Sequence, residues 1–385
     1  MAIGNRLSKL WSDLPQCLLE LILERLILSD RLRFGSVCRS WRIAQVQCLY
    51  PPASQIPFPV FRRNSSIERR SIEFFSLSEK RIYKAPMPDC GTPMHCILCV
   101  SSSHGWLLFR TLDGHKSGFL FNPFNRKYIQ LPDEISFRTE YFNGTFFCNP
   151  ITLPSGNFGT DLSGFFFSTP TNPDGVLYVK GCRYRFMLCA LKYLPQHSKW
   201  IRRLANTEDA VSNTIFCGGN LYALKDDWTL AVINPLSPHN ITNVKMRNPV
   251  YNRLASLRRD LKDCKYILVE SCGEILLVII HGENCWFRSE GRLFREVFRA
   301  DLTQMQWVRV QNLDDRILFL TCRTSISICA SGTGYKGNRI YYIPTHNNVT
   351  KYLELELGTN KTTRHSIPVP DVTMICEWFT PCLFP

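Results

Sequence analysis

Two patterns among the cysteines, histidines and glycines have spacings that can carry chemistry. The first is Cys96-Ile-Leu-Cys99, with Cys90, His95 and His104 close by in the sequence, and all are residue types that bind zinc. A structural zinc site needs a second ligand pair, but the sequence holds no second Cys-x-x-Cys. The apolar residues between the two cysteines are typical of a strand. We therefore predict buried strand cysteines here, and no metal site.

The second pattern is Gly332-Thr-Gly-Tyr-Lys-Gly337, which has the glycine spacing of a dinucleotide-binding loop. Such a loop leads from a strand into a helix, whose first N–H groups bind the pyrophosphate. Residues 325–331 and 338–343 both have the composition of strands, so we predict a hairpin loop without a cofactor. The sequence also contains no Gly-x-Ser-x-Gly elbow, phosphate-binding loop or His-Glu-x-x-His. It predicts no catalytic residue, no cofactor and no enzymatic activity of this chain.

The composition predicts a folded chain that is rich in strands. Of the 385 residues, 45% are hydrophobic, which excludes general disorder, while 12% aromatic residues and 23 prolines favour strands and turns. No apolar run approaches the roughly 18 residues of a membrane span, and the first residues lack the apolar core of a signal peptide. We expect a protein of the cytoplasm or nucleus that is not secreted, has no membrane partner and keeps its 17 cysteines reduced.

The formal net charge of +14 raises the question of nucleic acid as a partner. The charge is spread along the chain, however, and its densest stretch, residues 245–265, also contains Asp260 and Asp263. No recognition helix accompanies that stretch. We therefore do not expect nucleic-acid binding, and a basic surface suits an acidic protein partner at least as well.

Residues 11–48 have the apolar spacing of short amphipathic helices. One apolar stripe consists of Leu14, Leu18, Leu21, Ile22 and Leu26. A second consists of Phe34, Val37, Cys38 and Trp41. Two or three short helices cannot bury a self-sufficient core. The unit therefore either caps the rest of the chain or offers its apolar face to a partner.

A glycine-led motif recurs after the helices, beginning at Gly105, Gly219, Gly273 and Gly337. Each motif continues with an apolar strand, a turn, a second strand that ends near Asn-Pro or Asp-Leu, and a short strand that often carries Trp. The intervals correspond to one or two units of about 54 to 64 residues, which is typical of propeller blades. A pair of β-sandwiches is the structural alternative, although it does not explain the recurring order.

The helical segment resembles an F-box, a module that binds a Skp-type adaptor and, through it, a cullin–RING ubiquitin ligase. The resemblance rests on Leu14-Pro15, on a first helix that contains Leu21-Ile22 and ends in Arg25-Leu26, on Asp30 and Leu32, and on Val37-Cys-Arg-Ser-Trp-Arg42. One departure is Ile27-Leu28, where the family often has proline or a polar residue. The resemblance implies adaptor contacts by Leu14, Pro15, Leu18, Ile22, Leu26, Leu32, Val37, Cys38 and Trp41. Some of these side chains must instead hold the helices together.

The chain from about residue 70 onward resembles DUF295, the kelch-like β-propeller domain of a large plant F-box family. The similarity is strongest in residues 266–344 and includes segments 269–278, 298–302, 313–320, 337–342 and 378–381. The expected fold is mainly β, with a short all-α F-box (residues 10–50), a linker (51–72) and a β-propeller of about five or six blades (73–385).

Together the two resemblances imply the substrate-recognition subunit of an SCF-type (Skp–cullin–F-box) E3 ubiquitin ligase. The F-box would bind the adaptor, and the propeller would recruit an unidentified protein for ubiquitination and degradation, so this chain supplies proximity and no bond chemistry. The sequence assigns no substrate-binding residues. One alternative is a propeller small-ligand binder or enzyme with the helices as a cap, which needs convergent carboxylates or histidines in the central channel. A nucleic-acid binder, whose affinity falls with salt, is the other alternative.

Overall fold

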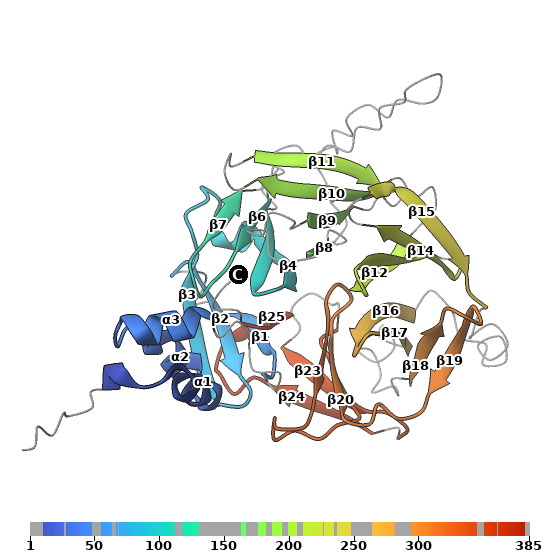
Figure 1. Ribbon diagram of the computed structural model, residues 1–385. Coiled ribbons are helices and arrows are strands. Elements are labelled where there is room, and N and C mark those ends of the chain that lie inside the picture. Colours follow the sequence, from blue (N-terminus) through green and yellow to red (C-terminus); the bar gives the residue numbers. More distant parts are fainter. Residues whose placement is uncertain are drawn as a thin grey trace, which may run out of the picture.

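The computed structural model describes residues 11–26, 28–47, 55–63, 67, 69–111, 118–130, 163–166, 176–181, 187–194, 199–205, 211–225, 227–234, 237–247, 264–281, 294–344, 350–359 and 361–381. Within these ranges three short α-helices precede strands that form six sheets (Figure 1). The sheets follow one another along the chain and are arranged around a common centre, as the blades of a propeller. The predicted mainly-β fold with a helical N-terminal unit is confirmed.

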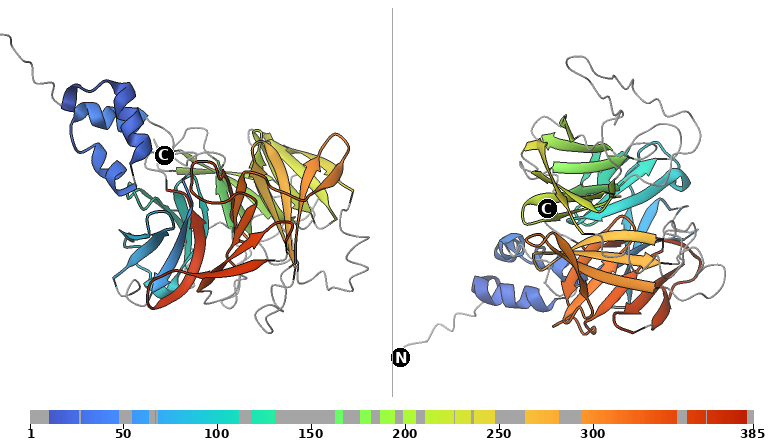
Figure 2. Two further views of the ribbon diagram at one scale, coloured as in Figure 1. Left: turned by 90° about the horizontal axis from the view of Figure 1, so that it is seen from below. Right: turned by 90° about the vertical axis from the view of Figure 1, so that its right-hand side faces the viewer.

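The helical unit is formed by η1 (Trp11–Asp13), α1 (Gln16–Arg25), α2 (Leu28–Phe34) and α3 (Arg39–Gln47). Pro15 is the residue directly before α1, and the helix begins without a side-chain capping bond. The unit projects from the side of the first blade (Figure 2). Among the described helices, none has the length and apolarity that crossing a membrane requires.

The first three blades contain the following strands. The first blade has the order β25 (Val372–Phe379), β1 (Phe58–Arg63), β2 (Ser71–Ser76), β3 (Arg81–Pro86). The second follows the short helix η2 (Met94–Cys96) and has the order β4 (Ile97–Ser103), β5 (Trp106–Thr111), β6 (Gly118–Phe121), β7 (Tyr128–Gln130). The third has the order β8 (Ser163–Phe166), β9 (Val176–Gly181), β10 (Met187–Leu194), β11 (Lys199–Ala205).

The other three blades continue the ring. The fourth has the order β12 (Val211–Cys217), β13 (Asn220–Lys225), β14 (Thr229–Asn234), β15 (Ser237–Lys245). The fifth has the order β16 (Cys264–Ser271), β17 (Glu274–His281), β18 (Phe294–Asp301), β19 (Gln306–Val310). The sixth has the order β21 (Ser325–Cys329), β20 (Arg316–Leu320), β22 (Arg339–Tyr342), β23 (Lys351–Glu356), β24 (Thr362–Ser366).

The two ends of the propeller sequence meet in the first blade. β25 pairs antiparallel with β1, with Phe58 opposite Phe379 and Val60 opposite Glu377. β25 also contacts β4 of the second blade, β4 contacts β8, and β16 contacts both β12 and β21, so these are the inner strands of the ring. Pairing the last strand with the first closes the ring, so the first and last blades pack against each other and do not expose an apolar face.

The recurring glycines lie in equivalent two-residue turns between the first and second strands of a blade. These turns are His104-Gly105, Gly218-Gly219 and Cys272-Gly273, and both residues of each have positive φ. Positive φ at both positions defines the type I′ turn, whose twist matches an antiparallel hairpin and whose second position favours glycine. The glycine spacing therefore identifies blades because it identifies these turns.

The Asn-Pro and Asp-Leu signals mark a second kind of turn. Asn122 follows β6, and its side-chain oxygen accepts hydrogen bonds from the N–H groups of Phe124 (3.0 Å) and Asn125 (3.1 Å). Asp301 ends β18 and accepts in the same way from the N–H groups of the residues two and three positions later. Both turns come after the third strand of a blade. The sequence motif counted this strand as the second, because the inner strand precedes the glycine.

The fourth motif, at Gly337, departs from this plan, and the predicted hairpin at residues 332–337 is wrong. β22 does not pair with β21, because β20 lies between them and pairs parallel with β22. The glycine-rich segment is thus a crossover connection. Gly337 is needed there for close packing, since a Cβ atom at this position would lie 2.3 Å from the carbonyl oxygen of Asp314.

The predicted linker, residues 51–72, is wrong for the segment that forms β1. Five of the six residues of Phe58–Arg63 are buried, and this strand pairs with both β2 and β25. The propeller therefore begins earlier than expected. Its strand was missed because its principal partner, β25, lies at the opposite end of the sequence.

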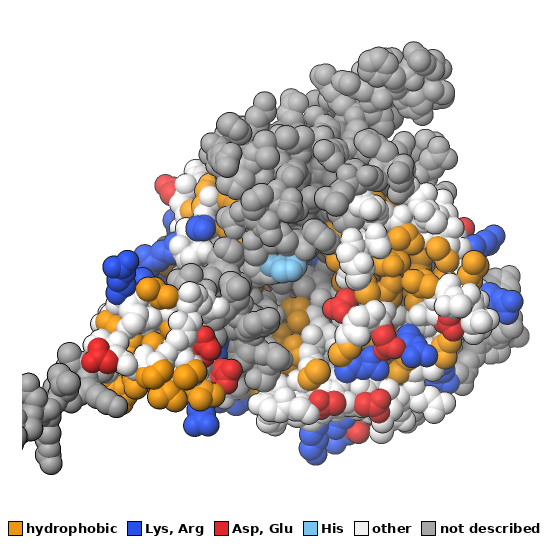
Figure 3. Space-filling model, in the orientation of Figure 1, with side chains coloured by type: hydrophobic (Ala, Val, Ile, Leu, Met, Phe, Trp, Pro, Cys, Tyr) orange, Lys and Arg blue, Asp and Glu red, His pale blue; other side chains and the backbone are white. Residues whose placement is uncertain are grey.

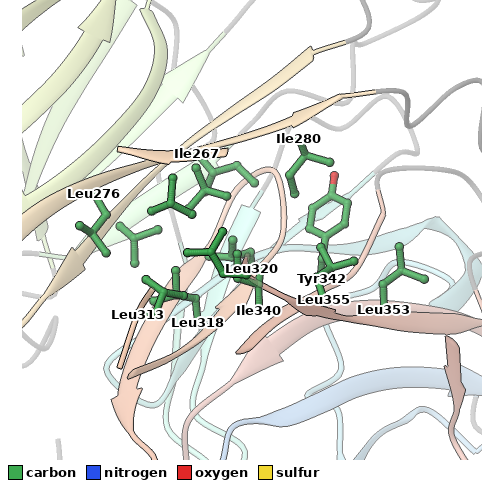
Figure 4. Packing of buried hydrophobic residues seen from close by; sticks show 14 residues of the cluster. Ile267, Leu276, Ile280, Leu313, Leu318, Leu320, Ile340, Tyr342, Leu353 and Leu355 are labelled. Atoms are coloured by element: carbon green, nitrogen blue, oxygen red, sulfur yellow. The ribbon is translucent and has the colours of Figure 1, made fainter. Parts of the chain in front are cut away.

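The blades are held together by apolar side chains that interdigitate between neighbouring sheets. Figure 4 shows the cluster between the fifth and sixth blades, where Ile267 and Leu276 face Leu318 and Ile340. A corresponding cluster joins the first and second blades. Each blade buries both faces only against its neighbours, so closure of the ring and formation of the core depend on each other.

Candidate adaptor-binding surface

The three helices share a small apolar core. Leu19 and Leu23 of α1, Phe34 of α2 and Ala44 of α3 are buried together. The rings of Phe34 and Trp41 lie 4.3 Å apart between centroids, which fixes the start of α3 against the end of α2. Each helix contributes one face to this core, and apolar side chains on the other faces remain at the surface.

Buried polar groups fix the helices relative to one another. The Arg31 guanidinium donates a 2.7 Å hydrogen bond to the carbonyl oxygen of Leu23, and the Gln45 side-chain amide donates to the carbonyl oxygen of Arg31. Arg42 donates to the carbonyl oxygen of Gly35 at 3.1 Å. These bonds tie α1 to α2 and α2 to α3 through backbone carbonyl groups.

The segment before α1 is tied to α3. The Trp41 indole donates a 3.0 Å hydrogen bond to the carbonyl oxygen of Trp11, and the Ser40 hydroxyl donates to that of Ser12 at 2.9 Å. Two solvent-exposed hydrogen bonds therefore hold η1 against the start of α3.

The predicted adaptor contacts fall into two groups. Pro15, Leu18 and Val37 are exposed, with 44% of Leu18 and 56% of Val37 accessible, so they are free to meet a partner. The side chains that are only half-buried against the helical core are Leu14, Ile22, Leu26 and Trp41. Leu32 lies in α2, and its side chain is outside the described part of the structure.

Cys38 is half-buried in the turn before α3, and its sulfur lies 3.0 Å from the Ser40 hydroxyl. That hydroxyl, and then the backbone N–H of Trp41, lower the pKa of the Cys38 thiol by stabilising the thiolate. Cys38 therefore contacts Ser40 within the turn, and part of its side chain remains exposed.

Three exposed apolar residues were absent from the predicted contact set: Trp11, Leu21 and Ile43. Leu18 and Leu21 lie on one face of α1 because they are three residues apart. Figure 3 shows hydrophobic side chains gathered over the helical unit at the lower left. Helical periodicity and the F-box resemblance both included Leu21, whereas the expected adaptor contacts did not. Exposed apolar groups of this density on a small unit mark an interaction surface.

The cysteine pattern considered for zinc is divided between two environments. Cys99 is buried in β4, as predicted, and burial raises the pKa of its thiol well above the usual range, which disfavours the thiolate that zinc requires. Cys96 is half-buried and lies in η2, so the strand prediction is wrong for it. Within the described ranges no group of three or more His, Cys, Asp or Glu side chains is arranged to hold a metal ion.

The turn between β20 and β21, residues 321–324, joins several blades near the propeller centre. Thr324 accepts a hydrogen bond from the backbone N–H of Ser102 in β4 (3.3 Å), and Asn213 of β12 donates to the carbonyl oxygen of Cys322 (3.4 Å). The indole of Trp378 in β25 donates to the carbonyl oxygen of Leu320 at 3.1 Å. These contacts connect the sixth blade to the first, second and fourth blades.

Comparison with protein families identifies both parts of the chain. The F-box domain model matches residues 11–45, which is the helical unit, and the KIB1-4 beta-propeller model matches residues 74–371. Both matches agree with the architecture that the sequence predicted, while the designation DUF295 stays a prediction.

Several F-box proteins of Arabidopsis thaliana are similar to the chain. F-box protein At2g26160 is 25% identical over 352 residues, covering 86% of this chain and 95% of that protein. F-box protein SKIP23 is 24% identical over 366 residues, covering 83% and 80%. Two further F-box proteins are 31% and 32% identical over 132 and 130 residues, and there the match spans only 32% and 34% of the relatives' own length. The chain belongs to the KIB1-4 beta-propeller family and carries an F-box domain ahead of the propeller.

Proposed function

We propose that this chain is the substrate-recognition subunit of an SCF-type E3 ubiquitin ligase. The observation that carries the proposal is the coincidence of the F-box match with a helical unit that leaves Leu18, Leu21, Val37 and Ile43 exposed. Burying such side chains against a partner provides the main favourable free energy of association. The partner proposed is a Skp-type adaptor, which would connect the chain to a cullin–RING ligase.

The propeller would then present a protein target to the ligase. The chain performs no chemistry in this scheme, because its contribution is to hold the target near the ubiquitin-carrying enzyme. The proposed site of action is the cytoplasm or nucleus, and a fluorescent fusion found only in the secretory pathway would contradict that part of the proposal.

Proximity labelling in plant cells tests the receptor role. The full chain is fused to a labelling enzyme and compared with the double variant Leu18→Ala/Val37→Ala, with and without proteasome inhibition. A receptor labels adaptor and cullin only in the wild-type form, and its targets accumulate when the proteasome is inhibited.

A matched control for surface hydrophobicity is available on the propeller. Leu302 and Met305 are exposed to 39% and 53%, similar to Leu18 and Val37, but lie in the turn after β18. The variant Leu302→Ala/Met305→Ala should label adaptor and cullin as the wild type does. Equal labelling of adaptor and cullin by the two double variants would contradict the proposed adaptor surface.

A further inference from the structure

Two exposed cysteines from neighbouring blades lie next to each other on the propeller. Cys272 is the first residue of the two-residue turn between β16 and β17, and Cys329 is the last residue of β21. Both are free and exposed. Neither takes part in the proposed adaptor surface or in the candidate zinc pattern.

Contacts between β16 and β21 place these two cysteines close to each other. β16 and β21 are contacting inner strands of the fifth and sixth blades. The hydroxyls of Ser271 in β16 and Ser327 in β21 lie 2.7 Å apart. Cys272 directly follows Ser271, and Cys329 lies on the same face of β21 as Ser327 because side chains alternate along a strand.

The contact between β16 and β21 and the pairing of Ser271 with Ser327 place the two thiols beside each other. Partial desolvation and the neighbouring Cys272, followed by the Asp315 carboxylate, raise the pKa of the Cys329 thiol, while Arg316 opposes this effect. An exposed thiol pair in contact differs from the buried cysteines of this chain, because an oxidant can reach it and each sulfur has a partner to resolve the first product.

We propose that Cys272 and Cys329 are a peroxide-responsive thiol pair that closes to a disulfide between the fifth and sixth blades. The Cys272 thiol loses its proton and its sulfur attacks one oxygen of hydrogen peroxide. The O–O bond breaks, and proton uptake gives a sulfenic acid on Cys272 and one water. We assign this first attack to Cys272 because it lies in an exposed two-residue turn, whereas Cys329 ends a strand beside the Asp315 carboxylate, which disfavours its thiolate.

The Cys329 sulfur then attacks the Cys272 sulfur, the S–O bond breaks, and a second water leaves with the Cys329 proton. Overall, two thiols and one hydrogen peroxide give one disulfide and two waters, and the two electrons lost by sulfur reduce the peroxide. The new bond would link the β16–β17 turn to the end of β21.

Cys217 provides an internal comparison. It ends β12, where it precedes the equivalent turn of the fourth blade, and its thiol donates a 3.3 Å hydrogen bond to the carbonyl oxygen of Gly273. Cys217 is buried, and burial raises the pKa of its thiol. It therefore lies beside the same turn without being open to peroxide, and Cys217→Ser is the matched control variant.

The test exposes the purified full chain to hydrogen peroxide and maps its cysteines by mass spectrometry without reduction. The expected result is a peptide linking Cys272 to Cys329 and the loss of two maleimide-reactive thiols per chain, both reversed by dithiothreitol. Cys217→Ser should retain this link. A cyclic 1,3-diketone probe for sulfenic acid should label Cys272 in Cys329→Ser, and should leave Cys329 unlabelled in Cys272→Ser.

Each other outcome overturns the proposal. If peroxide leaves both thiols reactive with maleimide, the pair is not redox-responsive. A disulfide between Cys272 and Cys217, or disulfides only between two chains, would show that Cys329 is not the partner of Cys272. Because adaptor binding is not part of this test, its result is independent of the proposed ligase function.

Discussion

Replacing Glu377 with glutamine should change how the stability of the propeller depends on pH. Glu377 lies in β25 and is completely buried. It is opposite Val60 of β1, in the strand pair that closes the ring. Its carboxylate accepts a 3.1 Å hydrogen bond from the backbone N–H of Trp378. Burial raises its pKa to about 7, although the nearby Thr321 and Thr324 hydroxyls and the charge of Arg323 favour the ionised form.

The size of the effect follows from the difference between the folded and unfolded pKa values. A rise from 4.5 to about 7 corresponds to about 3 kcal/mol, at ~1.4 kcal/mol per pH unit. Because the folded pKa is the higher one, the folded state binds the proton more tightly. This stabilisation is complete below the unfolded pKa and is lost as the pH rises through about 7.

The assay is urea unfolding of the full chain from about pH 5 to about pH 8, with the free energy of unfolding measured for wild type and Glu377→Gln. The wild type should lose about 2.5 kcal/mol more than the variant over this interval, because part of the effect is already lost at pH 5. Glutamine keeps the shape and one acceptor oxygen, so the pH slope is compared, and not the absolute stability.

Glu73 is the matched control because it is also buried but has the opposite electrostatic setting. Arg63 donates to its carboxylate at 2.5 and 2.6 Å, and Lys84 lies at 3.2 Å. Burial alone would raise the pKa of Glu73, but these two cations outweigh burial and lower it. Stability from Glu73 is thus present above its unfolded pKa of 4.5 and lost only at lower pH, so Glu73→Gln should leave the slope between about pH 5 and about pH 8 unchanged. If Glu73→Gln and Glu377→Gln altered the pH slope in the same direction, the reasoning would be refuted.

Two further changes test the packing between strands and blades. Gly337→Ala places a Cβ atom 2.3 Å from the carbonyl oxygen of Asp314 and should lower the free energy of unfolding by about 1–3 kcal/mol; an unchanged value in urea denaturation would contradict this close approach. Arg295, in β18, donates to the carbonyl oxygens of Glu356 (3.1 Å) and Lys361 (2.9 Å) of the sixth blade, so Arg295→Ala should cost about 2–4 kcal/mol and speed proteolytic cleavage in the turn after β23. Wild-type cleavage kinetics in that variant would show that the guanidinium does not hold the turn.

The recurring blade turns could be predicted from the sequence because their determinant is local. Gly105, Gly219 and Gly273 each supply the positive φ of a two-residue hairpin turn, so their spacing follows the blades. Gly337 has the same spacing but a different cause, since it allows close packing beside a parallel strand pair. A pattern of glycines does not distinguish these causes, and the sixth blade was consequently assigned a hairpin that it lacks.

The first strand could not be predicted because its pairing is non-local. Residues 58–63 follow a stretch of prolines and carry no alternation that stands out, and they become a buried strand only when β25 and β2 lie on either side. The same limit applies to the helices. Their periodicity predicted the apolar stripes, but which side of each stripe is core depended on contacts such as that of Phe34 with Trp41.

Binding of the folded full chain to a purified Skp-type adaptor, measured by calorimetric titration, tests the central claim most directly. The account predicts a one-to-one complex that Leu18→Ala/Val37→Ala weakens by about 30-fold, since two truncated interface side chains cost about 2 kcal/mol together. Leu302→Ala/Met305→Ala should bind as the wild type does. A folded wild-type chain that binds no adaptor, or a helical variant that binds with unchanged affinity, would contradict the account.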